Sequence, residues 1–423
     1  MRVCRGAALL TVLIALLSVP LGNVAQQPAL VNTTEMRSLR ELQQAGDAFV
    51  RAARESVEAT RIRTRAVPTR GASMLAMDVE EISLTNPLNN TARVTAEREF
   101  VPSVVVNASR SRAAAQVALE EARLDRILLS RAIELEVQAI EASVWNRIRS
   151  RHIEEDSLLV RASATLNARF ATGEARYVDV IRMRTERIRV QSDAARAAAN
   201  STRARLQLTA FVAAPNETVG RAIASIAGLP IPSLPDTETL IRQAPAIRIA
   251  RAELEIARTG VAAARAESAW RWSAGLGLQR FEVRSGYTVG PALVGSLTIP
   301  TSQRSVQAAL VSAATRDTLS ATGIFAGAVW NLRSEAAIAD ARLSAGRQRF
   351  EGVDLRLLNA AREERESALV GYATGELTLV ELLDFERALA HAEIQRLESY
   401  LDMVAAWAGL WRAATSLDRE GAR

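Results

Sequence analysis

Apolar residues recur every three or four positions over most of the chain, which predicts long amphipathic helices packed against one another. One such series in the second half is Ile247, Ala250, Leu254, Ala257, Val261 and Ala264, and residues 390–411 continue the same spacing. This is the heptad pattern of helices that pack knobs-into-holes. Residues 104–169 contain neither proline nor glycine, so a single helix there would be about 100 Å long at about 1.5 Å per residue. A periplasmic coiled coil would give the same helical signal.

A different period governs residues 270–299, where apolar residues alternate with small or polar ones around a turn near 284–286. Period two predicts a β-hairpin with one apolar face. Each strand has the length needed to cross a bilayer at a tilt, and Trp270, Trp272 and Tyr287 are the candidate membrane-facing aromatics near its ends. A lone hairpin leaves backbone groups unpaired in lipid, so a membrane role requires strands from other subunits. The alternative is a hairpin of a soluble sheet.

A second, weaker hairpin is predicted from residues 71–84 and 92–101 around a turn at 86–90. Leu75, Met77 and Val79 alternate acceptably, but several acidic residues interrupt the pattern. Arg98 falls on the side of Val94 and Phe100, where a lipid-facing surface has no evident use for a charge.

The chain contains the same unit twice. Residues 170–181 and 372–383 share five identities at an offset of 202, and Val101-Pro-Ser recurs as Ile299-Pro-Thr at an offset of 198. Between the copies, a stretch rich in proline and glycine predicts a linker that interrupts the helices. The expected organisation is a signal peptide at 1–25, a first structural repeat at 26–213, a linker at 214–235, a second repeat at 236–415 and a tail at 416–423.

The first 25 residues have the features of a secretory signal peptide rather than a structural segment. Arg2 and Arg5 precede an apolar run over residues 6–19, and small residues allow cleavage after Ala25. An uncleaved anchor is the alternative. Cys4 is the only cysteine of the chain, so the mature protein is expected to have neither disulfides nor thiolate metal sites. No other segment approaches the length of a transmembrane helix, so any membrane crossing would be made by strands.

The charge pattern argues against nucleic-acid binding and enzymatic chemistry. The net charge is +6 and every fixed cation is arginine, yet acids are interspersed throughout, as on solvated helix faces. His152 and His391 are the only histidines. Neither has a histidine or cysteine at metal-ligand spacing, and no nucleophile motif or phosphate loop is present. We therefore expect no enzyme activity, no cofactor and no metal site, and solvated positions for both histidines.

The order of helix, hairpin, long helix, glycine-containing turn and helix, repeated around a proline-rich linker, resembles the TolC-like outer-membrane efflux proteins. The resemblance is carried by residues 244–258 and by the two Gly-Glu turns, and residues 375–411 are most similar to the heavy-metal branch that includes CzcC and CusC. It implies a mainly α-helical protein with a small transmembrane β part. Three subunits would form an α-helical barrel and share one 12-stranded β-barrel.

The family also implies location, partners and function. The chain would lie in the outer membrane of a Gram-negative bacterium and extend into the periplasm as a passive exit duct for small molecules or metal ions. It would work with a periplasmic adaptor and with an inner-membrane pump of the RND type. The helix-turn residues that would meet the adaptor are Phe170, Thr172, Gly173, Glu174, Thr374, Gly375 and Glu376. The alternatives are the duct of a type I protein secretion system, or a periplasmic coiled-coil scaffold.

The resemblance assigns a gate to the periplasmic entrance. Glu381 and Asp384 match acids that face the lumen in relatives, where threefold symmetry would turn each into a ring that favours cations. Asp179 and Tyr372 match two members of a polar link that closes the entrance, but the third, an arginine, is Leu377 here. Arg176 and Arg182 are candidate substitutes. We therefore expect a less tightly closed entrance than in relatives.

Overall fold

The computed structural model describes residues 29–67, 71–80, 91–283, 286–298 and 304–416. The predicted signal peptide lies outside the described residues. So do the predicted turns at 86–90 and 284–285, the repeated Ile299-Pro-Thr landmark, and the tail beyond Ser416.

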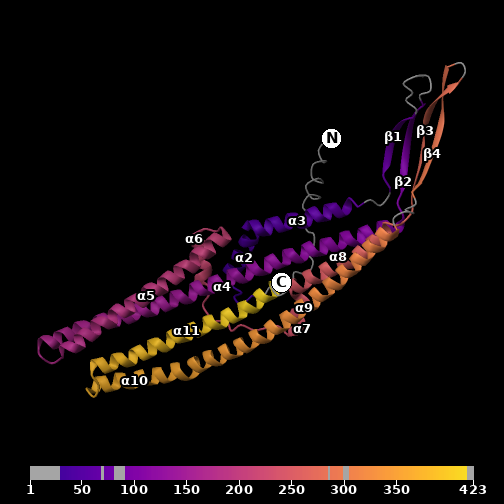
Figure 1. Ribbon diagram of the computed structural model, residues 1–423. Helices are drawn as coiled ribbons and strands as arrows, with labels where there is room; N and C mark the ends of the chain where they lie inside the picture. The colour runs from indigo at the N-terminus through magenta and orange to yellow at the C-terminus, as the bar shows by residue number, and fades with distance from the viewer. Residues whose placement is uncertain (1–28, 68–70, 81–90, 284–285, 299–303, 417–423) are drawn as a thin grey trace, which may run out of the picture.

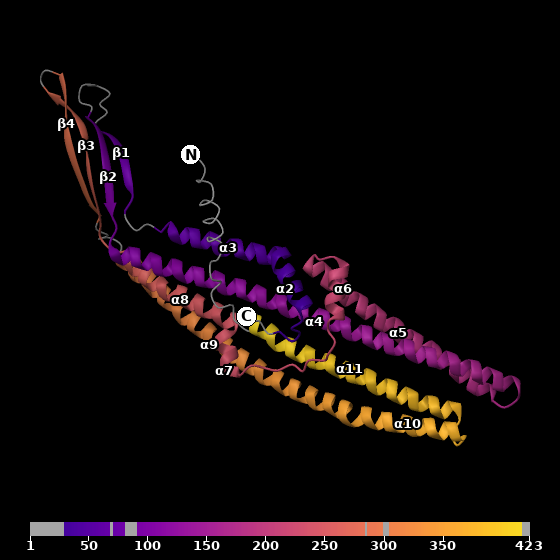
Figure 2. The ribbon, with the colours of Figure 1, turned by 180° about the vertical axis from the view of Figure 1, so that it is seen from behind.

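The molecule is elongated, with a β-sheet at one end and two helical turns at the other (Figures 1 and 2). The sequence expectation of one unbroken helix over 104–169 is confirmed by α4, which has 69 residues and would measure about 100 Å at about 1.5 Å per residue. The helices are α2 (Thr34–Gly46), α3 (Ala48–Arg65), α4 (Ser103–Ala171), α5 (Tyr177–Val212), α6 (Asn216–Ala224), α7 (Thr237–Gln243), α8 (Pro245–Ala266), α9 (Arg304–Gly352), α10 (Leu358–Thr374) and α11 (Leu379–Thr415).

Each half of the chain supplies a helix, a pair of strands, a long helix and a returning helix. The first half gives α3, the strands β1 (Ser73–Glu80) and β2 (Thr91–Phe100), α4 and α5. The second half gives α8, the strands β3 (Arg271–Val283) and β4 (Gly286–Thr298), and then α9 to α11. Within the described residues, β1 has 8 residues and β2 has 10, whereas β3 and β4 have 13 each.

The four strands form one antiparallel sheet in the order β1-β2-β3-β4. The two hairpins are joined through β2 and β3, where Val94 is opposite Leu278 and Phe100 is opposite Trp272. Because β1 pairs only with β2 and β4 only with β3, the sheet has two outer edges. The hairpins of the two halves therefore make one surface.

The main hydrophobic core lies midway along the molecule, where α2, α4, α5, α6, α9 and α11 meet. Trp407 and Tyr400 of α11 are fully buried in it, and the Tyr400 hydroxyl donates to the Pro230 carbonyl at 3.2 Å. Of the heptad positions predicted along α11, Ala390, Ile394, Val404, Ala408 and Trp411 are buried, and Leu397 and Leu401 are half-buried against the same core.

A buried ion pair fastens the N-terminal segment to this core. Glu136 of α4 is 1 % exposed, pairs with Arg40 of α2 and accepts from the Leu30 N–H at 2.7 Å. Burial raises the pKa of Glu136, while Arg40 opposes that rise. Hydrophobic periodicity did not predict this ion pair.

The linker was expected to interrupt the helices, but its residues 216–224 form the helix α6. Pro215 starts this helix instead of ending one, and its carbonyl accepts from the N–H groups of Thr218 and Val219. Proline suits a helix start because its missing N–H has no helical partner there. Val219 and Ala222 are buried, so part of the linker belongs to the core.

The counterpart of α4 in the second half is interrupted. A π-helical turn, η2 (Val353–Leu357), separates α9 from α10. The buried residues Phe350 and Val353 are three positions apart, but the next one, Leu358, comes five positions later. The π turn absorbs this extra residue and returns the helix to the same buried face.

None of the described helices is both long enough and apolar enough to cross a membrane.

Candidate functional site

One face of the sheet is apolar and open. Side chains opposite one another in an antiparallel sheet lie on the same face, and the register puts residues from all four strands there. The most exposed are Leu293 (83 %), Leu75 (79 %) and Met77 (71 %), joined by Val94, Leu276, Leu278, Val289 and Leu297. An apolar surface of this kind marks a contact with lipid or with another molecule.

The other face is polar and carries side-chain hydrogen bonds. Thr95 is fully buried and donates to Glu97 at 3.1 Å, and Ser273 lies 2.9 Å from Ser296. Gly277 makes room for Thr95, because a Cβ at this glycine would lie 2.6 Å from the Thr95 Cγ2. The register puts Asp78 and Glu99 on this face together with Glu97, so these acids, which made the first hairpin irregular in sequence, belong to the polar face.

Arg98 is on the apolar face, as the sequence suggested, and its register explains how a charge fits there. It is opposite Ser73 and Ala274, two residues before β2 ends beside the helices. At that end Phe100 stacks on Trp272, with ring centroids 3.9 Å apart and planes 8° apart. An exposed arginine at the edge of an apolar band can extend its guanidinium into water.

The candidate aromatic residues lie at the two ends of the sheet. Trp270, 62 % exposed, and Trp272, 48 % exposed, are at the end that adjoins the helices. Tyr287 is near the opposite end, where its backbone pairs with Glu282.

At the far end of the molecule, the two helical turns have the same backbone geometry. In the first, Gly173 has φ +81°, and the N–H of Glu174 donates to the Arg169 carbonyl at 2.8 Å. In the second, Gly375 has φ +83°, and the N–H of Glu376 donates to the Gly371 carbonyl at 2.8 Å. Both are glycine-dependent helix ends of the Schellman type, and they place the predicted adaptor-contacting residues at exposed tips (Figure 1).

Glu381 has a structural role that sequence analysis missed. Its carboxylate accepts from the backbone N–H of Thr378 at 2.8 Å, while the Thr378 hydroxyl accepts from the Glu381 N–H at 3.3 Å. This capping box starts α11. The hydrogen bond from the Thr378 N–H lowers the pKa of Glu381. The spacing Thr-x-x-Glu just before an apolar run was the available signal.

The other predicted gate residues are joined differently from the expected link. Asp179 is held by Arg176 of its own helix end at 3.2 Å, and Asp384 is held by Arg387 at 3.0 Å. Arg182 lies 3.8 Å from Asp384 and so joins α5 to α11. Tyr372 is half-buried, with no hydrogen bond to Asp179 among the described residues.

Leu377, at the position where the family resemblance implies an arginine, packs on the end of α10. A Cβ at Gly371 would lie 3.0 Å from its Cδ1. The apolar residue therefore contributes to the turn and forms no polar link.

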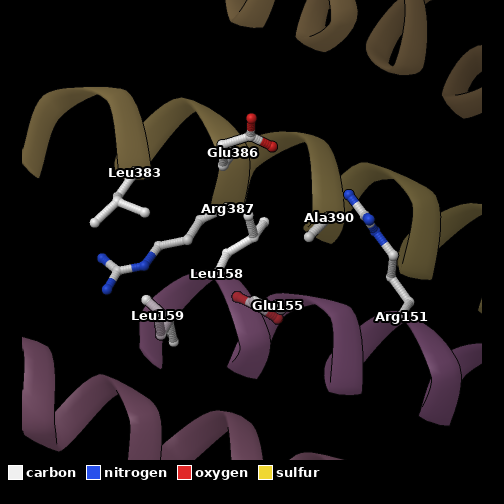
Figure 3. A pocket seen from close by; sticks show the side chains of 8 residues that line it. All are labelled: Arg151, Glu155, Leu158, Leu159, Leu383, Glu386, Arg387 and Ala390. Atoms are coloured by element: carbon white, nitrogen blue, oxygen red, sulfur yellow. The ribbon is translucent and has the colours of Figure 1, made fainter. Parts of the chain in front are cut away.

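Above the tips, α11 is joined to α4 by a small site with charged ends and a leucine centre (Figure 3). Arg151 of α4 pairs with Glu393 of α11 at 2.5 Å, and Arg387 lies 3.9 Å from Glu186 of α5. The lining residues are Arg151, Glu155, Leu158, Leu159, Leu383, Glu386, Arg387 and Ala390. Ion pairs and apolar packing of this kind hold helices together and suggest no chemistry.

His391 is exposed as expected, but His152 is not solvated. Its imidazole is only 12 % exposed and lies 3.4 Å from the Glu155 carboxylate. Within the described ranges, no group of three or more histidine, cysteine, aspartate or glutamate side chains is arranged to hold a metal ion.

Comparison with known proteins gives no match in sequence but a clear match in structure. No family model and no curated protein matches the chain. A membrane protein from Pseudomonas aeruginosa superposes with a TM-score of 0.73 at 19 % identity, over 91 % of this chain and 93 % of that one. The outer-membrane protein VceC from Vibrio cholerae gives 0.70 at 16 % identity, over 90 % and 96 %. CusC gives 0.68 at 15 % identity, over 92 % and 96 %.

The matches cover nearly the whole length of both partners, so they concern the complete arrangement of helices and sheet. CusC scores no higher than VceC, so the heavy-metal branch stays a prediction. The TolC-like architecture expected from the sequence is confirmed at the level of fold: the chain has the fold of the outer-membrane channel proteins.

Proposed function

We propose that this chain is one subunit of a homotrimeric outer-membrane duct, the exit component of a tripartite efflux system. Three copies would contribute four strands each to a 12-stranded barrel, and their long helices would form a tunnel into the periplasm. The duct is passive and carries out no chemistry. Energy comes from an inner-membrane pump, for which the RND type is the proposed partner.

The observation that carries the proposal is the open apolar face of the sheet together with its two outer edges. A four-stranded sheet with an apolar face cannot sit in lipid alone, because the outer sides of β1 and β4 would leave N–H and C=O groups unpaired. Joining β4 of one copy to β1 of the next removes both edges. The apolar face then meets lipid, and the polar face, with Glu97 and Ser296, meets water.

The tunnel entrance is proposed to lie at the helical tips. Asp384 is 46 % exposed, and a ring of three such carboxylates would favour cations at a narrow mouth. Asp179 and Tyr372 contribute to closure in this proposal. Glu381 takes part mainly by fixing the start of α11, because its carboxylate is engaged by Thr378.

The tips around Gly173 and Gly375 are the proposed docking points of a periplasmic adaptor. Their exposed position and shared backbone geometry support this assignment. The cargo is small molecules or metal ions.

Two other functions are the alternatives. A type I protein secretion duct would have the same fold and would export a polypeptide. A periplasmic scaffold would have no use for the apolar sheet face, which is the reason for placing it last.

Cell fractionation followed by bilayer recording tests the proposal. The full chain should be recovered from the outer membrane as a trimer, and the purified trimer should produce stepwise conductance in a planar lipid bilayer. Recovery as a soluble periplasmic monomer would contradict the duct and favour the scaffold.

A further inference from the structure

Near the tips, the long helices lie in the order α5, α4, α11, α10, because α5 packs on α4, α4 on α11, and α11 on α10. Figures 1 and 2 show α5 and α10 as the two outer members of this row. Each outer helix therefore has one face directed away from the rest of the chain.

The free face of α5 is apolar with one cation. Met183 and Val190 face the core and are 3 % exposed. On the opposite side, Tyr177, Ile181 and Ile188 are 60 %, 47 % and 62 % exposed, at the spacing of one helix face. Arg184 belongs to the same stripe, and it has no ion-pair partner among the described residues.

The free face of α10 has the opposite charge. Ala361 and Ala368 face α11 and are buried. On the outer side lie Val370, 65 % exposed, and the exposed carboxylates of Glu363 and Glu366. Neither carboxylate has a partner in the part of the chain that the structure describes.

The contrast with neighbouring charges makes these positions specific. Arg187, on the inner side of α5, pairs with Asp156 at 3.0 Å, and Arg365, on the inner side of α10, pairs with Glu386 at 2.7 Å. The inward charges Arg187 and Arg365 are therefore paired, whereas Arg184 on one edge and Glu363 and Glu366 on the other have no ion-pair partner among the described residues.

The two faces also lie at the same height along the molecule. Arg182 of α5 approaches Asp384 of α11, and Arg365 of α10 pairs with Glu386, two residues further along α11. Arg184 is therefore level with residue 365, between Glu363 and Glu366. Ile181 is correspondingly near the height of Val370.

We infer that the α5 edge of one copy docks on the α10 edge of the next, with Arg184 between Glu363 and Glu366 of its neighbour. The inference rests on the proposed trimeric duct and gives that trimer a specific contact near its entrance. Two different faces of each copy are used, so the contact is head-to-tail and closes into a ring. Apolar residues supply burial, and the charges fix which edges meet.

This contact is a candidate for the role of the polar link that Leu377 cannot form. It holds neighbouring copies together at the entrance through exposed charges, and exposed charges are screened by salt. Raising the salt to about 1 M shortens the Debye length to about 3 Å, so the contact loosens at high ionic strength.

Cysteine cross-linking in the full chain tests the inference. Cys4, the only natural cysteine, is changed to serine in every variant. Arg184→Cys combined with Glu366→Cys, treated with a short bismaleimide, should run as a covalent trimer in denaturing electrophoresis. Each single variant should stay monomeric. The matched control is Arg187→Cys with Glu366→Cys, which moves the first thiol to the inner side of α5 and should lose the cross-link.

Charge exchange gives a second test that does not depend on thiols. Arg184→Glu should lower the temperature at which the trimer dissociates and reverse the effect of salt, because salt screens the new repulsion between carboxylates. Adding Glu366→Arg should raise that temperature again and restore the destabilising effect of salt. A rescue that fails would overturn the inference.

The possible failures separate the two proposals. If the native protein has the mass of three copies but the double variant stays monomeric on denaturing gels, the edge contact is wrong and the duct stands. Cross-linking that stops at dimers indicates a twofold contact and contradicts the head-to-tail arrangement. A native protein with the mass of one copy contradicts the duct itself.

Discussion

The apolar face of the sheet makes a quantitative prediction for Leu293→Arg. β4 has 13 residues, which at about 3.3 Å per residue and a tilt of about 40° span about 33 Å along the membrane normal. This matches a hydrocarbon core about 30 Å thick. Leu293 is one residue from the strand centre and 83 % exposed, so its side chain would enter lipid about 3 Å from the midplane.

An arginine near the midplane of a barrel costs about 3 kcal/mol. Three copies carry the same change, so the trimer should lose about 9 kcal/mol. Val289→Arg, on the same face and about 8 Å from the midplane, should cost about 2 kcal/mol per copy because the penalty falls with depth. Val294→Arg is the matched control. It is adjacent to Leu293 but on the polar face, and it should cost under about 1 kcal/mol.

The assay is urea-dependent folding of the full chain into phospholipid vesicles, followed by tryptophan fluorescence. Trp270 and Trp272 lie at one end of the sheet and report on its insertion. The expected order of stability is Val294→Arg above Val289→Arg above Leu293→Arg. Equal losses at Leu293 and Val294, or a larger loss at Val294, would refute the assignment of the lipid-facing side.

Three further changes test the helical part. Gly375→Ala should destabilise the α10–α11 turn by about 1 kcal/mol, because an alanine is strained at a φ of +83°. Amide exchange around residue 375 should become faster. Unchanged exchange would contradict this backbone strain. The folded protein has a lowered pKa at Glu381. The ionised carboxylate therefore stabilises α11 at pH values above the ordinary glutamate pKa, and this stabilisation is lost as the pH falls through the lowered pKa. Thr378→Ala should remove this dependence from amide exchange in the first turn, and a retained dependence would exclude the capping box as its source. Glu136→Ala should cost about 3 kcal/mol in thermal or urea unfolding, because it leaves Arg40 buried without its partner; a loss below about 1 kcal/mol would show that the pair is not needed.

The sequence predicted the parts of the fold that depend on periodicity. The heptads of α11, the uninterrupted α4 and the alternation of β3 and β4 follow from spacing alone, because each repeats one simple pattern over many residues. The two glycine turns were also visible, since a left-handed residue at a helix end favours glycine.

The remaining features depend on tertiary contacts that periodicity does not encode. Pro215 indicated an interruption, yet it starts α6, because Val219 and Ala222 find a place in the core. The π turn after Gly352 showed only as one extra residue between Val353 and Leu358. His152 was expected in solvent, but α4 places it beside Glu155.

The candidate site was predicted less well than the fold. Family resemblance predicted Glu381 and Asp384 as acids of the entrance, but which carboxylate is free depends on hydrogen bonds and ion pairs with particular neighbours. Thr378 engages the carboxylate of Glu381, and Arg387 and Arg182 surround Asp384. Arg184 and Glu366 have no ion-pair partner among the described residues, and periodicity does not distinguish them from the paired charges around them.

Electron cryomicroscopy of the full chain in lipid nanodiscs tests the central claim most directly. The account predicts a particle of three copies, in which a barrel of twelve strands crosses the disc and a helical tunnel about 100 Å long, the length of α4 at about 1.5 Å per residue, projects from one side. Single copies outside the disc, or a sheet whose apolar face packs against protein, would contradict it.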